Sequence, residues 1–205
     1  MATRSDLVPR GVWGGALGPP IFVGAWVAGT IASDPGYSAV DDAISRLAAS
    51  GASTWPILTG GLVGYGVAMG AFSAALRAAG ERTWPIVAVN AVTTFGVAAT
   101  PLDHSPALDR AHGVFAFLGY ASLVAVPLVA RRGLGRRGPR SEAPATRRSV
   151  LAATAMPAAL VATAALVASI VDPDANGLWQ RVGLTTVDAW IVGWAWSLGR
   201  GRSTR

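Results

Sequence analysis

The side chains with acid–base potential lie mostly between, or at the ends of, long apolar runs of the sequence. His112 could exchange a proton with a substrate, and Asp42 or Asp188 could assist as a carboxylate or as a metal ligand. Ser45 with His112 and an aspartate has the composition of a hydrolase triad, but the sequence has no GxSxG nucleophile elbow. A metal would need three or four ligands, and no HExxH or comparable spacing is present. The motifs therefore assign no metal, cofactor or reaction.

Asp188 gives the sharpest single signal because it interrupts an otherwise uncharged apolar run. It follows Arg181 by seven residues, which is about 10 Å along a helix. An ionisable group at that depth of a membrane helix normally faces the bundle interior or water. Arg181 is on the same helical face and could reach toward Asp188 in a structural ion pair. A role for Asp188 in ligand or proton binding is the alternative. Asn90, within another apolar run, suits an interhelical hydrogen bond.

The composition indicates a membrane protein. The 205 residues are 52% hydrophobic and 14% charged, with a mean hydropathy of +0.44, whereas soluble domains have about 25% charged residues. The net charge is +6, but all the basic residues are Arg, in short segments between apolar runs. This arrangement favours a lipid bilayer rather than a nucleic acid as the partner. The absence of cysteine excludes disulfides and thiolate metal sites.

Six uncharged runs are long enough, or nearly so, to cross a bilayer as helices, which takes about 20 residues each. The sequence thus predicts an all-α fold, a six-helix transmembrane bundle that forms a single domain over residues 1–205. The expected spans are residues 12–33, 55–77, 83–102, 111–131, 149–171 and 179–199. Trp-Pro pairs at Trp55 and Trp84 open the second and third spans, since tryptophan suits the interface and proline suits a first helical turn.

The arginines predict the orientation of the spans. Most of them lie before the first span, between the second and third, in the basic loop 131–148, and after the sixth span. The alternate connections hold most of the acidic residues. The positive-inside rule then places the protein in the cell membrane with both termini and the basic loop in the cytoplasm.

The stretch LVPRGV at residues 7–12 resembles a thrombin-cleavage tag and is either native or tag-derived.

Residues 34–54, DPGYSAVDDAISRLAASGAST, lie on the extracytoplasmic side in this topology. Ser38 followed by Asp41 matches a capping box, so we expect a short amphipathic helix to begin near Ala39. Asp42 and Arg46 are spaced to pair across one helical turn. Gly51 can end the helix. Its apolar face would contain Val40, Ala43, Ile44, Leu47 and Ala48. Such a helix either caps the bundle or forms the polar wall of an outward-facing pocket.

Two polar blocks carry a family resemblance. PGYSAVDDAISRLAA follows the first span, and PLDHSPALDRAHGVFAF leads into the fourth. In sequence and placement they resemble the DUF998 family of bacterial six-span membrane proteins. The resemblance implies the six-span architecture and draws attention to Ser38, Asp42, Ser45 and His112. It implies no activity, because none is established for the family.

Three functional hypotheses follow. The first is a multi-pass membrane protein that binds a lipid or small amphiphile in an outward-facing polar pocket, with a role in transport or envelope assembly. The second is an intramembrane lipid-modifying enzyme that uses the His/Asp cluster. The third is a structural protein that stabilises a partner. Oligomeric state and cofactors are not readable. The residues proposed for the functional cluster are Ser38, Asp42, Ser45, Arg46, His112, Arg181 and Asp188.

Overall fold

The computed structural model describes residues 4–134 and 145–200, and this part of the chain is entirely helical and turn-connected, without strands. The prediction of an all-α fold is confirmed. The six α-helices are α1 (Arg4–Ile31), α2 (Trp55–Ala78), α3 (Trp84–Ala99), α4 (Pro106–Leu134), α5 (Ala145–Val171) and α6 (Asn176–Arg200). Two short 3₁₀ helices, η1 (Ile44–Ala48) and η2 (Pro173–Ala175), lie in the connections.

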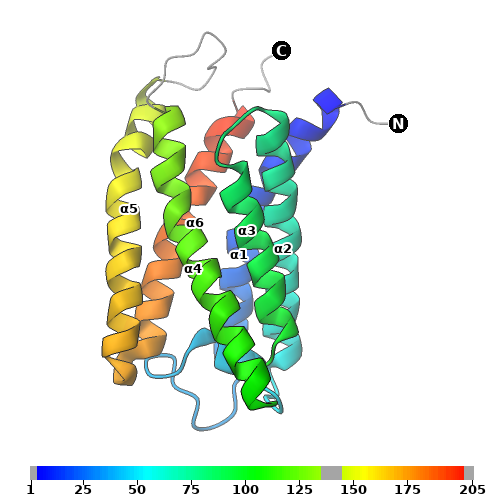
Figure 1. Cartoon of the computed structure of the whole chain (residues 1–205), viewed down its shortest axis with the longest axis vertical. Coiled ribbons are helices and arrows are strands. Elements are labelled where there is room, and N and C mark those ends of the chain that lie inside the picture. The colour runs from blue at the N-terminus through cyan, green and yellow to red at the C-terminus, as the bar shows by residue number, and fades with distance from the viewer. Residues whose placement is uncertain (1–3, 135–144, 201–205) are drawn as a thin grey trace.

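The six α-helices run up and down in one elongated bundle (Figure 1). α1 contacts α2 and α6, while α4 contacts α3, α5 and α6. The start of α1, the α2–α3 turn and the end of α6 lie together at one end of the bundle, which we call the basic end. The segment 32–54, the α3–α4 turn and the α5–α6 connection lie at the opposite, acidic end. Part of the predicted basic loop, residues 135–144, lies outside the described residues.

Local sequence explains where the helices begin and how closely they approach. α2 begins at Trp55 and α3 at Trp84, each with proline in the first turn, where its missing N–H costs nothing. Gly61 of α2 faces Ala25 of α1, and a Cβ at Gly61 would overlap the Ala25 methyl group. This contact agrees with the general use of small residues where membrane helices cross.

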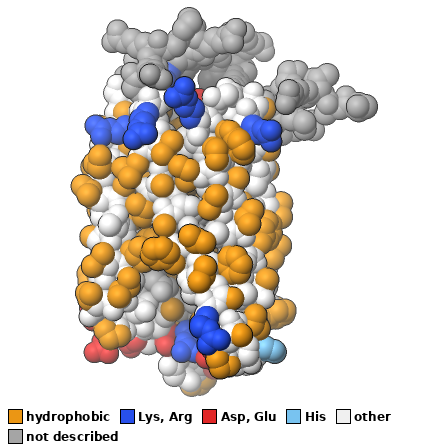
Figure 2. All heavy atoms as spheres, in the orientation of Figure 1, with side chains coloured by type: hydrophobic (Ala, Val, Ile, Leu, Met, Phe, Trp, Pro, Cys, Tyr) orange, Lys and Arg blue, Asp and Glu red, His pale blue; other side chains and the backbone are white. Residues whose placement is uncertain are grey.

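Within residues 4–134 and 145–200, four helices are long and apolar enough to cross a membrane. They are the segments Gly11–Ile31, Trp55–Ala78, Pro106–Leu134 and Arg147–Val171. α3 is also apolar, but its 16 residues are fewer than a full span requires. Figure 2 shows apolar side chains over the middle of the visible face, with arginines near the basic end and the acidic side chains mostly near the opposite end. This banding suits a protein embedded in a bilayer.

Aromatic side chains fill the half of the bundle nearer the basic end. Phe72 of α2 stacks edge-on against Trp194 of α6, with 5.3 Å between the ring centroids. Trp190 of α6 donates its indole N–H to the Leu151 carbonyl of α5 at 3.2 Å. Trp194 and Phe72 are almost fully buried. A cavity of about 150 Å³ lies in the half nearer the acidic end.

Segment 32–54 differs from the amphipathic helix expected from the sequence. Residues 39–42 form turns, and only Ile44–Ala48 is helical, as the 3₁₀ helix η1. Some backbone groups that would be hydrogen-bonded within an α-helix form hydrogen bonds with α6 instead. Leu178 N–H donates to the Val40 carbonyl at 2.9 Å, and Ile44 N–H donates to the Gln180 side chain at 3.2 Å. Tertiary hydrogen bonds therefore override the local helical pattern.

Candidate functional site

A cavity of about 150 Å³ lies inside the bundle near the acidic end. Every element except α5 and η2 contributes to its wall. α6 presents Gln180, Leu184 and Asp188, which are spaced four residues apart on one helical face. α4 presents His112, Ala116 and Tyr120, which are also spaced four residues apart. The wall is mainly apolar, with a few polar groups that converge from different helices, as in small-molecule sites.

Asp188 is the most buried ionisable group in this wall, with 2% of its surface exposed. Its Oδ1 atom is buried and has no hydrogen-bond partner among the described residues. The carboxyl group also interacts with the Tyr65 hydroxyl of α2. A buried carboxyl oxygen without a partner is costly, so Asp188 is a candidate for contact with a bound molecule.

Tyr65 and Asn90 link three helices beside Asp188. The Tyr65 hydroxyl donates to Asn90 Oδ1 at 2.9 Å, and Asn90 Nδ2 donates to the Gly119 carbonyl of α4 at 3.1 Å. The expected interhelical role of Asn90 is confirmed. These bonds hold one polar wall of the cavity in a defined position, because each partner comes from a different helix.

Tyr120 of α4 also lines the cavity and has a buried hydroxyl group. The residue is 7% exposed, and its hydroxyl oxygen has no hydrogen-bond partner in the described part of the chain. A Cβ at Gly183 of α6 would overlap this oxygen, so glycine is needed there for the ring to keep its position. Asp188 and Tyr120 thus line the same cavity, and each carries a buried oxygen that has no partner among the described residues.

His112 is buried in the second turn of α4 and also lines the cavity. Its Nδ1 atom lies 2.6 Å from the Thr100 carbonyl oxygen at the end of α3, and because a carbonyl only accepts, Nδ1 carries the proton of this hydrogen bond. This hydrogen bond fixes the ring orientation and leaves Nε2 as the nitrogen for any other partner.

The 3₁₀ helix η1 covers the outer end of the cavity. Ile44 and Ser45 line the cavity from this side, so Ser45 shares it with His112 and Asp188. Three of the proposed cluster residues therefore meet at one cavity. η1 is held by the Ile44–Gln180 bond and by Thr54, whose hydroxyl donates to the Leu47 carbonyl at 2.8 Å.

Arg181 does not point toward Asp188, and the ion pair expected from their spacing is not formed. Its guanidinium donates to the Ala39 carbonyl at 2.7 Å and to the Asp42 carbonyl at 3.2 Å, and also bonds the Tyr37 hydroxyl. The guanidinium carbon lies 5.2 Å from the centre of the Trp26 ring. Arg181 therefore clamps the turn that leads into η1, outside the cavity wall.

Asp42 and Ser38 also have local structural roles. Asp42 accepts the backbone N–H of Ser38 at 2.8 Å, and the Ser38 hydroxyl accepts the backbone N–H of Asp41 at 3.2 Å. Asp42 therefore bonds back to Ser38 instead of forward to Arg46, the partner expected in a regular helix. Neither Asp42 nor Ser38 lines the cavity.

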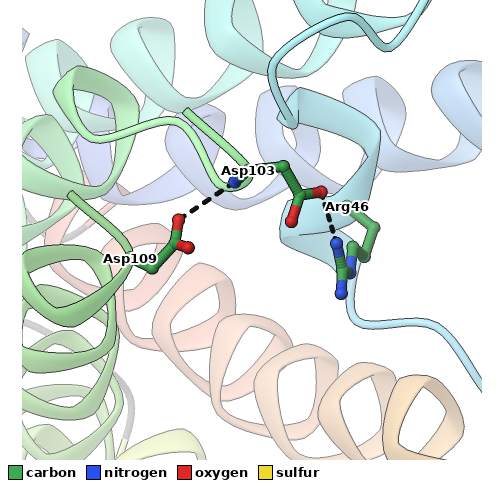
Figure 3. A network of polar contacts seen from close by, with 3 residues as sticks. All are labelled: Arg46, Asp103 and Asp109. Carbon is green, nitrogen blue, oxygen red and sulfur yellow. Dashed lines mark hydrogen bonds and ion pairs between the residues drawn. The ribbon is translucent and has the colours of Figure 1, made fainter. Parts of the chain in front are cut away.

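Arg46 joins η1 to the α3–α4 turn at the protein surface. It forms an ion pair with Asp103, whose backbone N–H donates to the Asp109 carboxylate at 3.0 Å (Figure 3). The two paired side chains are 48% and 53% exposed, so this pair is largely solvated.

No group of three or more metal-ligating side chains occurs within residues 4–134 and 145–200.

Tyr65 and Tyr120 line the cavity but were not predicted from the sequence. A signal was present, because Leu58, Leu62 and Tyr65 follow helical spacing, as do His112, Ala116 and Tyr120. That spacing defines a face of each helix, but it does not tell which faces meet. The order of helices in space is needed to bring the tyrosines beside Asp188.

The bundle of long apolar helices defines a helical membrane protein. A family model described as "Protein of unknown function (DUF998)" matches residues 16–197, and the chain belongs to this family. No curated protein and no solved structure gives a significant match.

Proposed function

We propose that the protein crosses the cell membrane six times, as one domain, with both termini in the cytoplasm. The support is that α3 and α6 run alongside the four helices that are long and apolar enough to span, over most of the same height (Figure 1). The arginines near the basic end agree with a cytoplasmic location by the positive-inside rule. The cavity and η1 then lie toward the outer side.

Single cysteines test this topology cleanly because the natural chain has none. Ser50 lies at the acidic end and Arg82 at the basic end, and both are exposed. In intact cells, a membrane-impermeant maleimide should label Ser50→Cys and leave Arg82→Cys unlabelled until the cells are opened. The reverse pattern would show that the orientation is wrong, and labelling of both would contradict an odd number of membrane crossings between them.

We further propose that the protein binds a small amphiphile in the cavity beneath η1. The observation that carries this proposal is that Asp188 and Tyr120, which both line this largely apolar cavity, each have a buried oxygen without a partner among the described residues. A bound molecule with a polar head would supply the missing hydrogen bonds, and its apolar body would contact the leucines of the same wall. Such a site suits a role in transport or in handling envelope components.

The size of the cavity limits the ligand. Apolar cavities of about 150 Å³ in proteins hold a molecule the size of benzene, and the volume here is about 150 Å³. A whole phospholipid is far larger. The proposal is therefore a small amphiphile with a body of about that size, or one end of a longer molecule.

The test is thermal unfolding of the purified protein in lipid nanodiscs with a panel of benzene-sized amphiphiles. A ligand at 100 times its Kd should add about 2.7 kcal/mol of stability. At least one compound should raise the Tm of the natural protein but not of Ala116→Phe, whose ring would occupy the cavity. Thr186→Ala is the matched control, because the Thr186 hydroxyl bonds its own helix at the Val182 carbonyl. No stabilisation by any compound would refute the binding site.

An intramembrane enzyme is the second candidate, favoured by the placement of Ser45, His112 and Asp188 on one cavity. A serine activated by the neutral His112 ring would react with a fluorophosphonate probe, and Ser45→Ala would abolish the labelling. The binding proposal expects no labelling of the natural protein. Labelling that depends on both Ser45 and His112 would replace binding with hydrolysis as the leading function.

A further inference from the structure

We infer that the ligand of the cavity is a small organic cation, an amine carried on an apolar body. This inference rests on the proposed binding function and goes further by naming the chemical class of the ligand. It starts from the charges around the cavity. Asp188 is the only Asp, Glu, Arg or Lys in the cavity wall, and it lacks a cationic partner among the described residues.

Three arginines lie at the same end of the bundle, and none of them lines the cavity. Arg110 is exposed in the first turns of α4, and the other two bond elsewhere. Arg181, two turns before Asp188 on α6, donates to the carbonyls of Ala39, Asp42 and Gly177. Arg46 on η1 is paired with Asp103 at the surface. His112 is the remaining titratable nitrogen group on the wall, and its Nδ1 is committed to Thr100. A buried carboxylate in a membrane protein is normally paired, and here the partner must come from a bound molecule.

The other polar atoms match an ammonium group. An ammonium carries donors and no acceptor, and Asp188 Oδ1 and the Tyr120 hydroxyl oxygen are both able to accept. The Phe22, Tyr65 and Tyr120 side chains also line the cavity and offer aromatic rings, which attract cations at their faces.

The remaining wall determines the rest of the ligand. Leu58, Leu62, Leu123 and Leu184 line the cavity, so the body attached to the amine should be apolar. An anionic ligand of the same size would meet the Asp188 carboxyl group without a compensating cation, which disfavours it. A neutral ligand can donate to Asp188 but gains no charge pairing. The expected order of affinity is therefore cation, then neutral molecule, then anion.

The experiment compares benzylamine, benzyl alcohol and benzoate, which share one phenyl ring and differ in charge. Binding is measured by calorimetry on the full chain in uncharged lipid nanodiscs. A hydrogen bond to a charged group is stronger than one between neutral groups, and we expect benzylamine to bind about ten-fold or more tightly than benzyl alcohol. Benzoate should show no binding. Asp188→Asn should reduce the ratio of the first two affinities to about one, while Asp188→Glu should retain the preference for the amine.

The outcomes separate the two proposals. Equal binding of benzylamine and benzyl alcohol to the natural protein, with both abolished by Ala116→Phe, would overturn the cationic class and leave the binding site intact. A preference for benzylamine that survives Asp188→Asn would likewise overturn the role of the carboxylate. If none of the three compounds binds, the cationic class is overturned; if no compound of the wider amphiphile panel stabilises the protein either, the binding site is refuted as well. If Asp188→Asn does not fold, the order of the three affinities on the natural protein and on Thr186→Ala still decides the ligand class.

Discussion

Replacement of Arg181 by alanine should destabilise the acidic end of the protein more than any other exchange of an arginine there. The side chain is 8% exposed, and its guanidinium bonds two carbonyls and one hydroxyl of the turn at residues 37–42. It also bonds the Gly177 carbonyl at 2.9 Å. Arg181→Ala would remove the donor to these partly buried acceptors and would weaken the attachment of the turn to α6.

The magnitude follows from these contacts. Hydrogen bonds to charged groups contribute about 1.5–3 kcal/mol each, and truncation of one member of a buried charged network costs about 3–5 kcal/mol. The contact with the Trp26 ring adds about 1 kcal/mol. Because the turn lies at the end of the bundle, water can reach part of it, so we expect a total loss of about 3–5 kcal/mol. In a chain of this size that is a fall in Tm of about 10 °C.

The matched control is Arg46→Ala at the same end of the molecule. Its ion pair with Asp103 is about half exposed, and such pairs contribute about 0–1 kcal/mol. The assay is thermal unfolding in nanodiscs, combined with limited proteolysis of segment 32–54. Arg181→Ala should lower the Tm and expose this segment to protease, whereas Arg46→Ala should do neither. Equal effects of the two variants, or a loss below about 1 kcal/mol for Arg181→Ala, would refute the clamp.

Three further substitutions test neighbouring contacts. Gly177→Ala should lower the free energy of unfolding by about 1–3 kcal/mol, since its Cβ would overlap the Asp42 carbonyl. Gly193→Ala, whose Cβ would make only an ordinary contact with the Leu151 side chain, is the control for thermal unfolding. Tyr120→Phe should leave unfolding unchanged or raise its free energy by about 1 kcal/mol, because the hydroxyl is buried without a partner, yet calorimetry should show weaker amine binding. Asn90→Ala should cost about 1–2 kcal/mol through its lost interhelical bonds, and an unchanged Tm would contradict that role.

Much of the helical framework could be predicted from the sequence. Uncharged runs and Trp-Pro pairs located the starts of α2 and α3 at Trp55 and Trp84. These signals are local, because a membrane helix forms its backbone hydrogen bonds within itself. Its sequence therefore needs only sufficient length and apolar character. Asn90 was also recognisable, since an amide inside an apolar run needs a partner on another helix.

The structure of segment 32–54 could not be predicted in the same way. Its apolar spacing favoured an α-helix, but the carbonyls of Ala39 and Val40 are taken by Arg181 and Leu178 of α6, far along the chain. The same limit applies to the cavity. Asp188 stood out as a charge in an apolar run, whereas its neighbours Tyr65 and Tyr120 became visible only when three helices were placed together.

The most direct test of the account is an experimental density map of the full chain in lipid nanodiscs with benzylamine. The account predicts density for the amine within hydrogen-bond distance of the Asp188 carboxyl group and beside the Tyr120 hydroxyl, covered by η1. A map in which protein side chains fill this space and a residue of the chain itself pairs with Asp188 would contradict it.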